Sequence, residues 1–176
     1  MKKLQREFGA NFEWISHELV PGDLEWPEPI LAKPEPPNKP KTPSRFQLAL
    51  AAEGLDPLIG RRPHNMRTHN ALEATEYAKT EGNIDAFVER LYVGHWICGL
   101  DINDLHVLKQ LSLGLIKDVE AMMKAIEDRL FDDKIVKFDD NSYAVGVYNL
   151  PTFWINGQRY AEQPYSVVRK AVLEVL

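Results

Sequence analysis

Proline density in residues 21–43 is the feature that most constrains how this chain can fold. Eight of the twelve prolines lie in this stretch, with Trp26 among them. Proline lacks a backbone N–H and fixes φ, so the stretch excludes a helix or an inner strand. We predict an exposed irregular connection, partly of polyproline type, with docking of a partner as the alternative. Regular elements must lie on either side of it.

Helix and strand patterns flank this connection and end at glycine or proline. On its N-terminal side, residues 1–9 predict the end of a helix and residues 12–19 predict a strand. On its C-terminal side, apolar spacing predicts helices over 45–55, 68–81, 83–96, 103–111 and 118–130. Short connections between the last four indicate a helical block. A strand at 152–155, an Asn156-Gly157 turn and a return strand at 158–160 predict a hairpin, followed by a helix over 164–176.

Composition excludes several classes of function. A formal net charge of -5 argues against nucleic-acid binding, which needs a concentrated basic surface. No apolar run is long enough to span a membrane, and no apolar segment follows Lys2 and Lys3 as in a secretory signal. We therefore expect a cytoplasmic protein without a membrane partner. The single cysteine, Cys98, excludes an intramolecular disulfide and a cysteine-based zinc site, and we expect it to be a small buried apolar residue.

Other polar residues show no spacing that is typical of a catalytic, metal or cofactor site. The five histidines do not form the repeated helix-face pairs that hold metals, so we interpret them as ordinary surface or core residues. We interpret Asp132-Asp133 and Asp139-Asp140 as solvated loop charges, and Arg61-Arg62 as a solvated pair rather than an anion site. No catalytic residue, metal or cofactor is expected from these patterns.

The sharpest motif lies near the C-terminus. Gly146-Val147 leads through Leu150-Pro151-Thr152-Phe153 into the Asn156-Gly157 hairpin. This order resembles the cis-proline segment of the thioredoxin fold, where an X-Pro bond takes the cis form at little energetic cost. A strand that merely begins with proline is the alternative. The resemblance implies a cis Leu150–Pro151 bond and a substrate-binding site at Leu150, Pro151 and Thr152.

Further segments narrow the resemblance to one branch of that superfamily. These are Trp14–Pro21, Thr68–Ala78, Gly99-Leu100-Asp101-Ile102 and Gln163-Pro164-Tyr165. In this order, over nearly the whole chain, they resemble the DsbA-like proteins, including FrnE-like disulfide isomerases. The resemblance implies an α/β, thioredoxin-like fold with an α-helical insertion. Residues 1–67 and 141–176 would form the thioredoxin-like part and 68–140 the insertion. The implied partner is a protein or a small thiol or disulfide.

The sequence departs from that family where its redox chemistry is carried out. The family begins with a strand and a Cys-x-x-Cys motif, whereas this chain begins inside the helix that follows, and Asn149-Leu150 stands for the usual Gly-Val before the proline. We therefore expect an N-terminally truncated form. Thiol-disulfide oxidoreductase or isomerase activity is implied by descent, but it needs two cysteines and is expected to be absent from the chain as given. The alternatives are a non-catalytic peptide- or thiol-binding module, or a glutathione-dependent transferase or isomerase similar to the kappa and hydroxychromene-carboxylate types.

Overall fold

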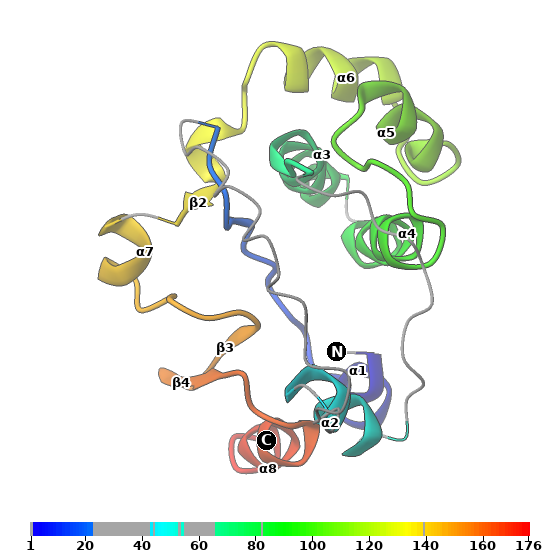
Figure 1. The fold of residues 1–176 in the computed structure, drawn as a ribbon. Coiled ribbons are helices and arrows are strands. Elements are labelled where there is room, and N and C mark those ends of the chain that lie inside the picture. Colours follow the sequence, from blue (N-terminus) through cyan, green and yellow to red (C-terminus); the bar gives the residue numbers. More distant parts are fainter. Residues whose placement is uncertain are drawn as a thin grey trace, which may run out of the picture. The chain divides into compact units, whose positions relative to one another are not determined.

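The chain has a mixed α/β fold in a computed structural model (Figure 1) that describes residues 2–22, 43, 45–52, 54, 66–81, 83–138 and 140–176. Most of the proline-rich connection predicted over 21–43 lies outside these residues, as do Arg61, Arg62 and Asp139. The chain divides into two compact units, which are described separately. We name them the hairpin unit (residues 1–15, 42–57 and 139–176) and the helical unit (residues 16–41 and 58–138).

The hairpin unit is built around two antiparallel strands. Its described elements are α1 (Lys2–Phe8), α2 (Arg45–Ala52), α7 (Asp140–Ala144), β3 (Thr152–Ile155), β4 (Gln158–Ala161) and α8 (Tyr165–Leu173). Ile155 pairs with Gln158 across a two-residue turn in which Asn156 and Gly157 both have positive φ. Such a turn matches the natural twist of a hairpin, and the predicted hairpin is confirmed.

A small apolar core supports this hairpin. Leu4 of α1 and Val168 and Val172 of α8 are buried together. Partly buried side chains complete the cluster, namely Phe8, Ala10, Phe12, Phe153, Ile155 and Tyr165. Because alternate residues of a strand point to opposite faces, Phe153 and Ile155 face this core, and Thr152 and Trp154 face away from it.

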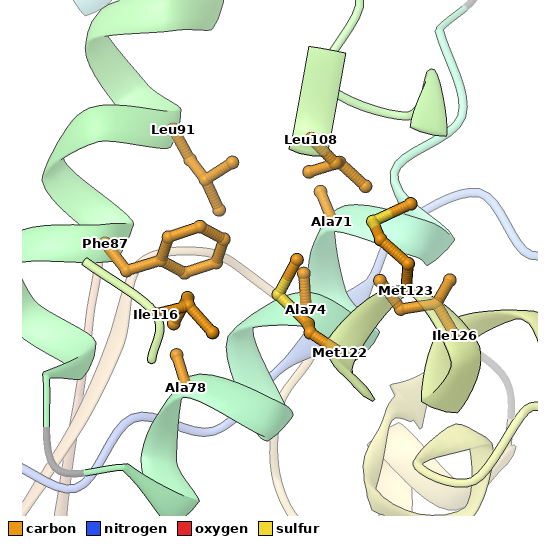
Figure 2. Packing of buried hydrophobic residues seen from close by; sticks show 10 residues of the cluster. All are labelled: Ala71, Ala74, Ala78, Phe87, Leu91, Leu108, Ile116, Met122, Met123 and Ile126. Atoms are coloured by element: carbon orange, nitrogen blue, oxygen red, sulfur yellow. The ribbon is translucent and has the colours of Figure 1, made fainter. Parts of the chain in front are cut away.

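The helical unit has a larger core. Its described elements are β1 (His17–Glu18), α3 (His69–Thr80), α4 (Ile84–Trp96), α5 (Leu105–Ser112), α6 (Val119–Glu127), the 3₁₀ turn η1 (Asp132–Lys134) and β2 (Val136–Lys137). Helix α3 contacts α4, α5 and α6. Figure 2 shows the ten buried residues between them: Ala71, Ala74, Ala78, Phe87, Leu91, Leu108, Ile116, Met122, Met123 and Ile126. Three alanines on α3 allow the larger side chains of α4 and α6 to approach it closely.

Two predictions about local structure are wrong. The strand expected over residues 12–19 is only His17–Glu18, because Phe12 packs into the core of the hairpin unit instead of extending a ladder. Its parallel partner β2 was not predicted, since two residues give no alternation to read. Cys98 is exposed, not buried. It lies in the turn after α4, where its neighbours Ile97 and Leu100 are exposed as well.

Candidate functional site

The segment before β3 contains the site residues expected from the sequence. The Leu150–Pro151 peptide bond is cis, as expected. Leu150 and Pro151 are exposed and Thr152 is half-buried. The Thr152 hydroxyl donates a hydrogen bond to the Asn149 carbonyl, and the Glu162 amide donates to the Pro151 carbonyl at 2.9 Å. The three residues therefore form one turn, and the bond from Glu162 fixes the backbone of this turn to the end of β4.

The opposite edge of β3 has no strand partner among the described residues. The bond from Glu162 to Pro151 continues the alternating ladder of the hairpin, so Pro151, Phe153 and Ile155 turn their backbone groups toward β4. Thr152 and Trp154 must then turn their N–H and C=O groups to the outer edge. This edge begins directly after the cis bond and offers donors and acceptors in an extended row.

An aromatic face lies on the side of the hairpin that points away from its core. We define it by Tyr143, Tyr148, Trp154 and Arg159. Its three aromatic side chains are largely exposed to solvent, Tyr143 by 60%, Tyr148 by 45% and Trp154 by 49%. Tyr143 and Tyr148 stack with ring centroids 5.5 Å apart. The Arg159 guanidinium lies 4.1 Å from the centroid of the Tyr148 ring. Large exposed aromatic side chains gathered in this way are typical of a binding surface.

Arg159 is fixed in place by neutral acceptors. Its Nε donates to the Gly146 carbonyl at 2.5 Å and its Nη2 to Asn149 Oδ1 at 3.0 Å. The Asn149 amide in turn donates to Glu162 Oε2 at 2.9 Å. In the described part of the chain Arg159 makes no ion pair of its own, so its positive charge is compensated only through the Asn149 amide. A carboxylate supplied by a ligand would neutralise the charge of Arg159 directly.

Gly146 is needed at this site for two reasons. Its φ is +76°, which L side chains rarely adopt. A Cβ at this position would also lie 3.1 Å from Trp154 Cζ2. The Trp154 ring therefore packs on bare backbone, with the Arg159 side chain also next to Gly146.

A second group of functional side chains lies in the helical unit. His69 Nδ1 is 3.1 Å from Glu18 Oε2, and His69 Nε2 is 3.0 Å from Glu73 Oε1. Both carboxylates are buried, with Glu18 1% and Glu73 0% exposed. His69 is thus a partly buried histidine with two carboxylate partners, which the interpretation of the histidines as surface or core residues did not foresee.

The acidic pair Asp132-Asp133 was interpreted as solvated loop charge, and only Asp132 differs from this interpretation. Asp132 Oδ1 lies 3.2 Å from Lys137 Nζ and 3.4 Å from His69 Nε2, so it is a paired charge at the edge of the His69 cluster. Asp133 is exposed, as expected, and its closest cation is Lys134 at 3.8 Å. Across the residues that the structure describes, no three His, Cys, Asp or Glu side chains are arranged to hold a metal ion.

Sequence reasoning found the cis-proline turn but missed both clusters of side chains. His69 and Glu73 are four apart on one helix, and this spacing was a usable signal. Glu18 gave none, because its partner lies 51 residues away. The aromatic face could have been suspected from Tyr143, Tyr148 and Trp154, which lie around the cis-proline motif.

Comparisons with known proteins add no family to these observations. No model of a known protein family matches the sequence, and no curated protein matches it either. The described helices include none that is both long and apolar enough to cross a membrane. Function has to be inferred from the residues themselves.

Proposed function

We propose that this chain is a thioredoxin-like, DsbA-related module that binds an extended peptide along the outer edge of β3. The observation that carries the proposal is the edge at Thr152 and Trp154, with which no described strand pairs and which directly follows the cis Leu150–Pro151 bond. An extended peptide can add to such an edge as a further strand, with its main chain supplying affinity and alternate side chains supplying specificity.

The side chains beside this edge indicate what kind of peptide fits. Trp154, Tyr148 and Leu150 are exposed and favour an apolar or aromatic side chain on the ligand. Arg159, which lacks an ion pair among the described residues, favours a neighbouring acidic side chain. The proposed ligand is therefore an extended segment in which acidic and aromatic residues alternate.

Binding rather than disulfide exchange is proposed because of the cysteine content. Exchange by this family needs an attacking thiolate and a second, resolving thiol. Residues 1–176 contain only Cys98, which belongs to the helical unit, whereas Pro151 belongs to the hairpin unit. We expect the purified chain not to catalyse reduction of insulin. Turnover that disappears in Cys98→Ser would contradict this and would make Cys98 a catalytic residue.

The binding test uses labelled short peptides with alternating Glu and Phe residues. We expect saturable binding by fluorescence polarisation, with NMR shifts concentrated on the Thr152 and Trp154 amides. A matched peptide with Lys in place of Glu should bind more weakly, and a peptide N-methylated at alternate residues should not bind, because it cannot donate to the strand edge. Equal binding of the N-methylated peptide, or shifts confined to the helical unit, would refute strand addition.

A further inference from the structure

The His69 ring bonds two buried carboxylates at once, and this fixes how many protons the group holds. Its Nδ1 contacts Glu18 at 3.1 Å and its Nε2 contacts Glu73 at 3.0 Å. A neutral imidazole has one N–H and one acceptor nitrogen, and an ionised carboxylate can only accept. Both bonds can form only if the group holds one proton more than a neutral ring and two carboxylates. That proton belongs to the three residues together, whichever atom carries it.

The two carboxylates depend on this proton to different degrees. Glu73 Oε1 also accepts from Arg129 Nη1 at 3.0 Å, and Glu73 Oε2 accepts from the Phe131 amide at 3.3 Å. Glu18 Oε1 is buried without a hydrogen-bond partner, so His69 is the only group that compensates Glu18 in the described part of the chain. Loss of the extra proton would leave Glu73 satisfied but would leave Glu18 as a buried, uncompensated charge, which is strongly unfavourable.

The remaining charged groups near the ring roughly balance one another. Asp132 lies 3.4 Å from His69 Nε2 and 3.2 Å from Lys137, and Arg129 pairs with Glu73. On the β1 side, the Arg67 guanidinium donates to the Val20 carbonyl at 3.0 Å. With the extra proton, the three carboxylates Glu18, Glu73 and Asp132 meet three positive charges, on the His69 group, Arg129 and Lys137. Without it the cluster has an excess negative charge next to Glu18.

Glu18 is part of the strand pair that lies next to two of the four points where the chain passes between its units. These two points, between residues 15 and 16 and between residues 138 and 139, flank β1 and β2, and the other two fall at 41–42 and 57–58. The pair is held by bonds from the Val136 amide to the Ser16 carbonyl at 3.0 Å and from the Phe138 amide to the Glu18 carbonyl at 2.9 Å. Glu18 is thus the residue through which this pair is bonded to α3.

We propose that the Glu18–His69–Glu73 network holds the β1–β2 pair to α3 in a proton-dependent way and releases it as pH rises. The held state binds one proton more than a released state with a neutral ring and two ionised carboxylates, so a rise in pH favours release, by at most about tenfold per pH unit. The device acts within the helical unit and does not depend on peptide binding at β3.

Hydrogen exchange of the Val136 and Phe138 amides in the whole chain tests the proposal, after correction for intrinsic base catalysis. We expect their protection to fall as pH rises, by at most about tenfold per pH unit. The Met122 amide of α6, which donates to the Asp118 carbonyl, should show a smaller dependence. Protection of Val136 and Phe138 that does not change with pH would overturn the proposal.

One substitution separates this network from other titrating groups. In Glu18→Gln the new amide can donate to a neutral ring, so no extra proton is needed, and we expect the pH dependence of the Val136 and Phe138 amides to disappear. The matched control is Glu76→Gln. Glu76 is also a buried carboxylate, but it is on α3 and pairs with Lys79, not with His69. It should keep the wild-type slope. A slope that survives in Glu18→Gln would overturn the proposal, and if that variant does not fold, the wild-type slope decides alone.

Discussion

The two units of this chain treat apolar and charged side chains in opposite ways. The helical unit buries ten apolar residues in one cluster and also buries three carboxylates, Glu18, Glu73 and Glu76, which pair with His69, Arg129 and Lys79. The hairpin unit buries three apolar residues in its cluster and leaves Trp154, Tyr148 and Tyr143 about half exposed or more. The comparison teaches that the buried polar groups here belong to stability, and that the exposed apolar groups serve recognition in the function we propose.

The largest expected effect is on the core of the helical unit. Phe87 is 0% exposed within the α3–α4–α6 cluster, so Phe87→Ala should lower the free energy of unfolding by about 3–5 kcal/mol. Trp14 is only half-buried, so Trp14→Ala should cost less. Denaturant unfolding of both variants measures this. Equal losses would remove the contrast between the two units.

The next effect concerns the buried charges. His69→Ala removes the only partner that a Glu18 carboxylate oxygen has among the described residues and should cost about 3 kcal/mol, the lower end for a broken buried pair because the ring is itself partly exposed. Lys124→Ala is the control, since Lys124 and Asp128 are an exposed pair on α6 that should contribute little to stability. Similar midpoint shifts in urea for the two variants would mean that the His69 cluster contributes no more to stability than the exposed Lys124–Asp128 pair.

On the aromatic face the expected effect is on binding and not on stability. Trp154→Ala should weaken the alternating Glu/Phe peptide by about 2 kcal/mol, as for an aromatic interface residue, with little change in unfolding. Tyr92 is a similarly exposed aromatic residue in the helical unit, so Tyr92→Ala should leave the affinity unchanged. Fluorescence polarisation titrations of the two variants compare them directly.

Arg159 should contribute less than Trp154. Arg159→Lys keeps the positive charge but loses the planar stack on Tyr148 and the paired bonds to Gly146 and Asn149. We expect about 0.5–1 kcal/mol weaker binding of the Glu-containing peptide. The Lys-containing peptide serves as the control, and an equal loss with it would show that Arg159 does not recognise the acidic side chain.

The smallest expected effect on stability comes from the surface charge pair of Glu7 and Arg169 in the hairpin unit. The hydrogen bond from Arg169 is the main cause that lowers the pKa of Glu7, and Tyr165 adds a further bond. A lowered folded pKa means that this contribution is present above about pH 4.3, the ordinary value for glutamate, and is lost as pH falls below it. Amide exchange in α1 should therefore speed up in acid, and Glu7→Gln should remove this dependence. An unchanged acid response in Glu7→Gln would assign it elsewhere.

Local patterns predicted most of the helices and the hairpin because each is determined by neighbouring residues. The Asn156-Gly157 turn, the Leu150-Pro151 bond and the apolar spacing of α3 and α4 are of this kind. The β1–β2 pair and the Glu18 contact with His69 were not predictable, because they join residues far apart in sequence and each strand has only two residues. For the same reason the sequence predicted a substrate-binding site at residues 150–152 but gave no sign of the Arg159 side chain beside them.

The pairing of β1 with β2 has a consequence for the order in which the helical unit folds. The bond between His17 and Val136 closes a loop of 119 residues. Closing such a loop in an unstructured chain costs on the order of 4 kcal/mol of entropy, and two short strands recover little of this. Helices α3 to α6, whose contacts are nearer in sequence, shorten the effective loop once they have formed. The strand pair should therefore assemble last and separate first, so the chain next to two of the junctions between the units is also the latest to become ordered.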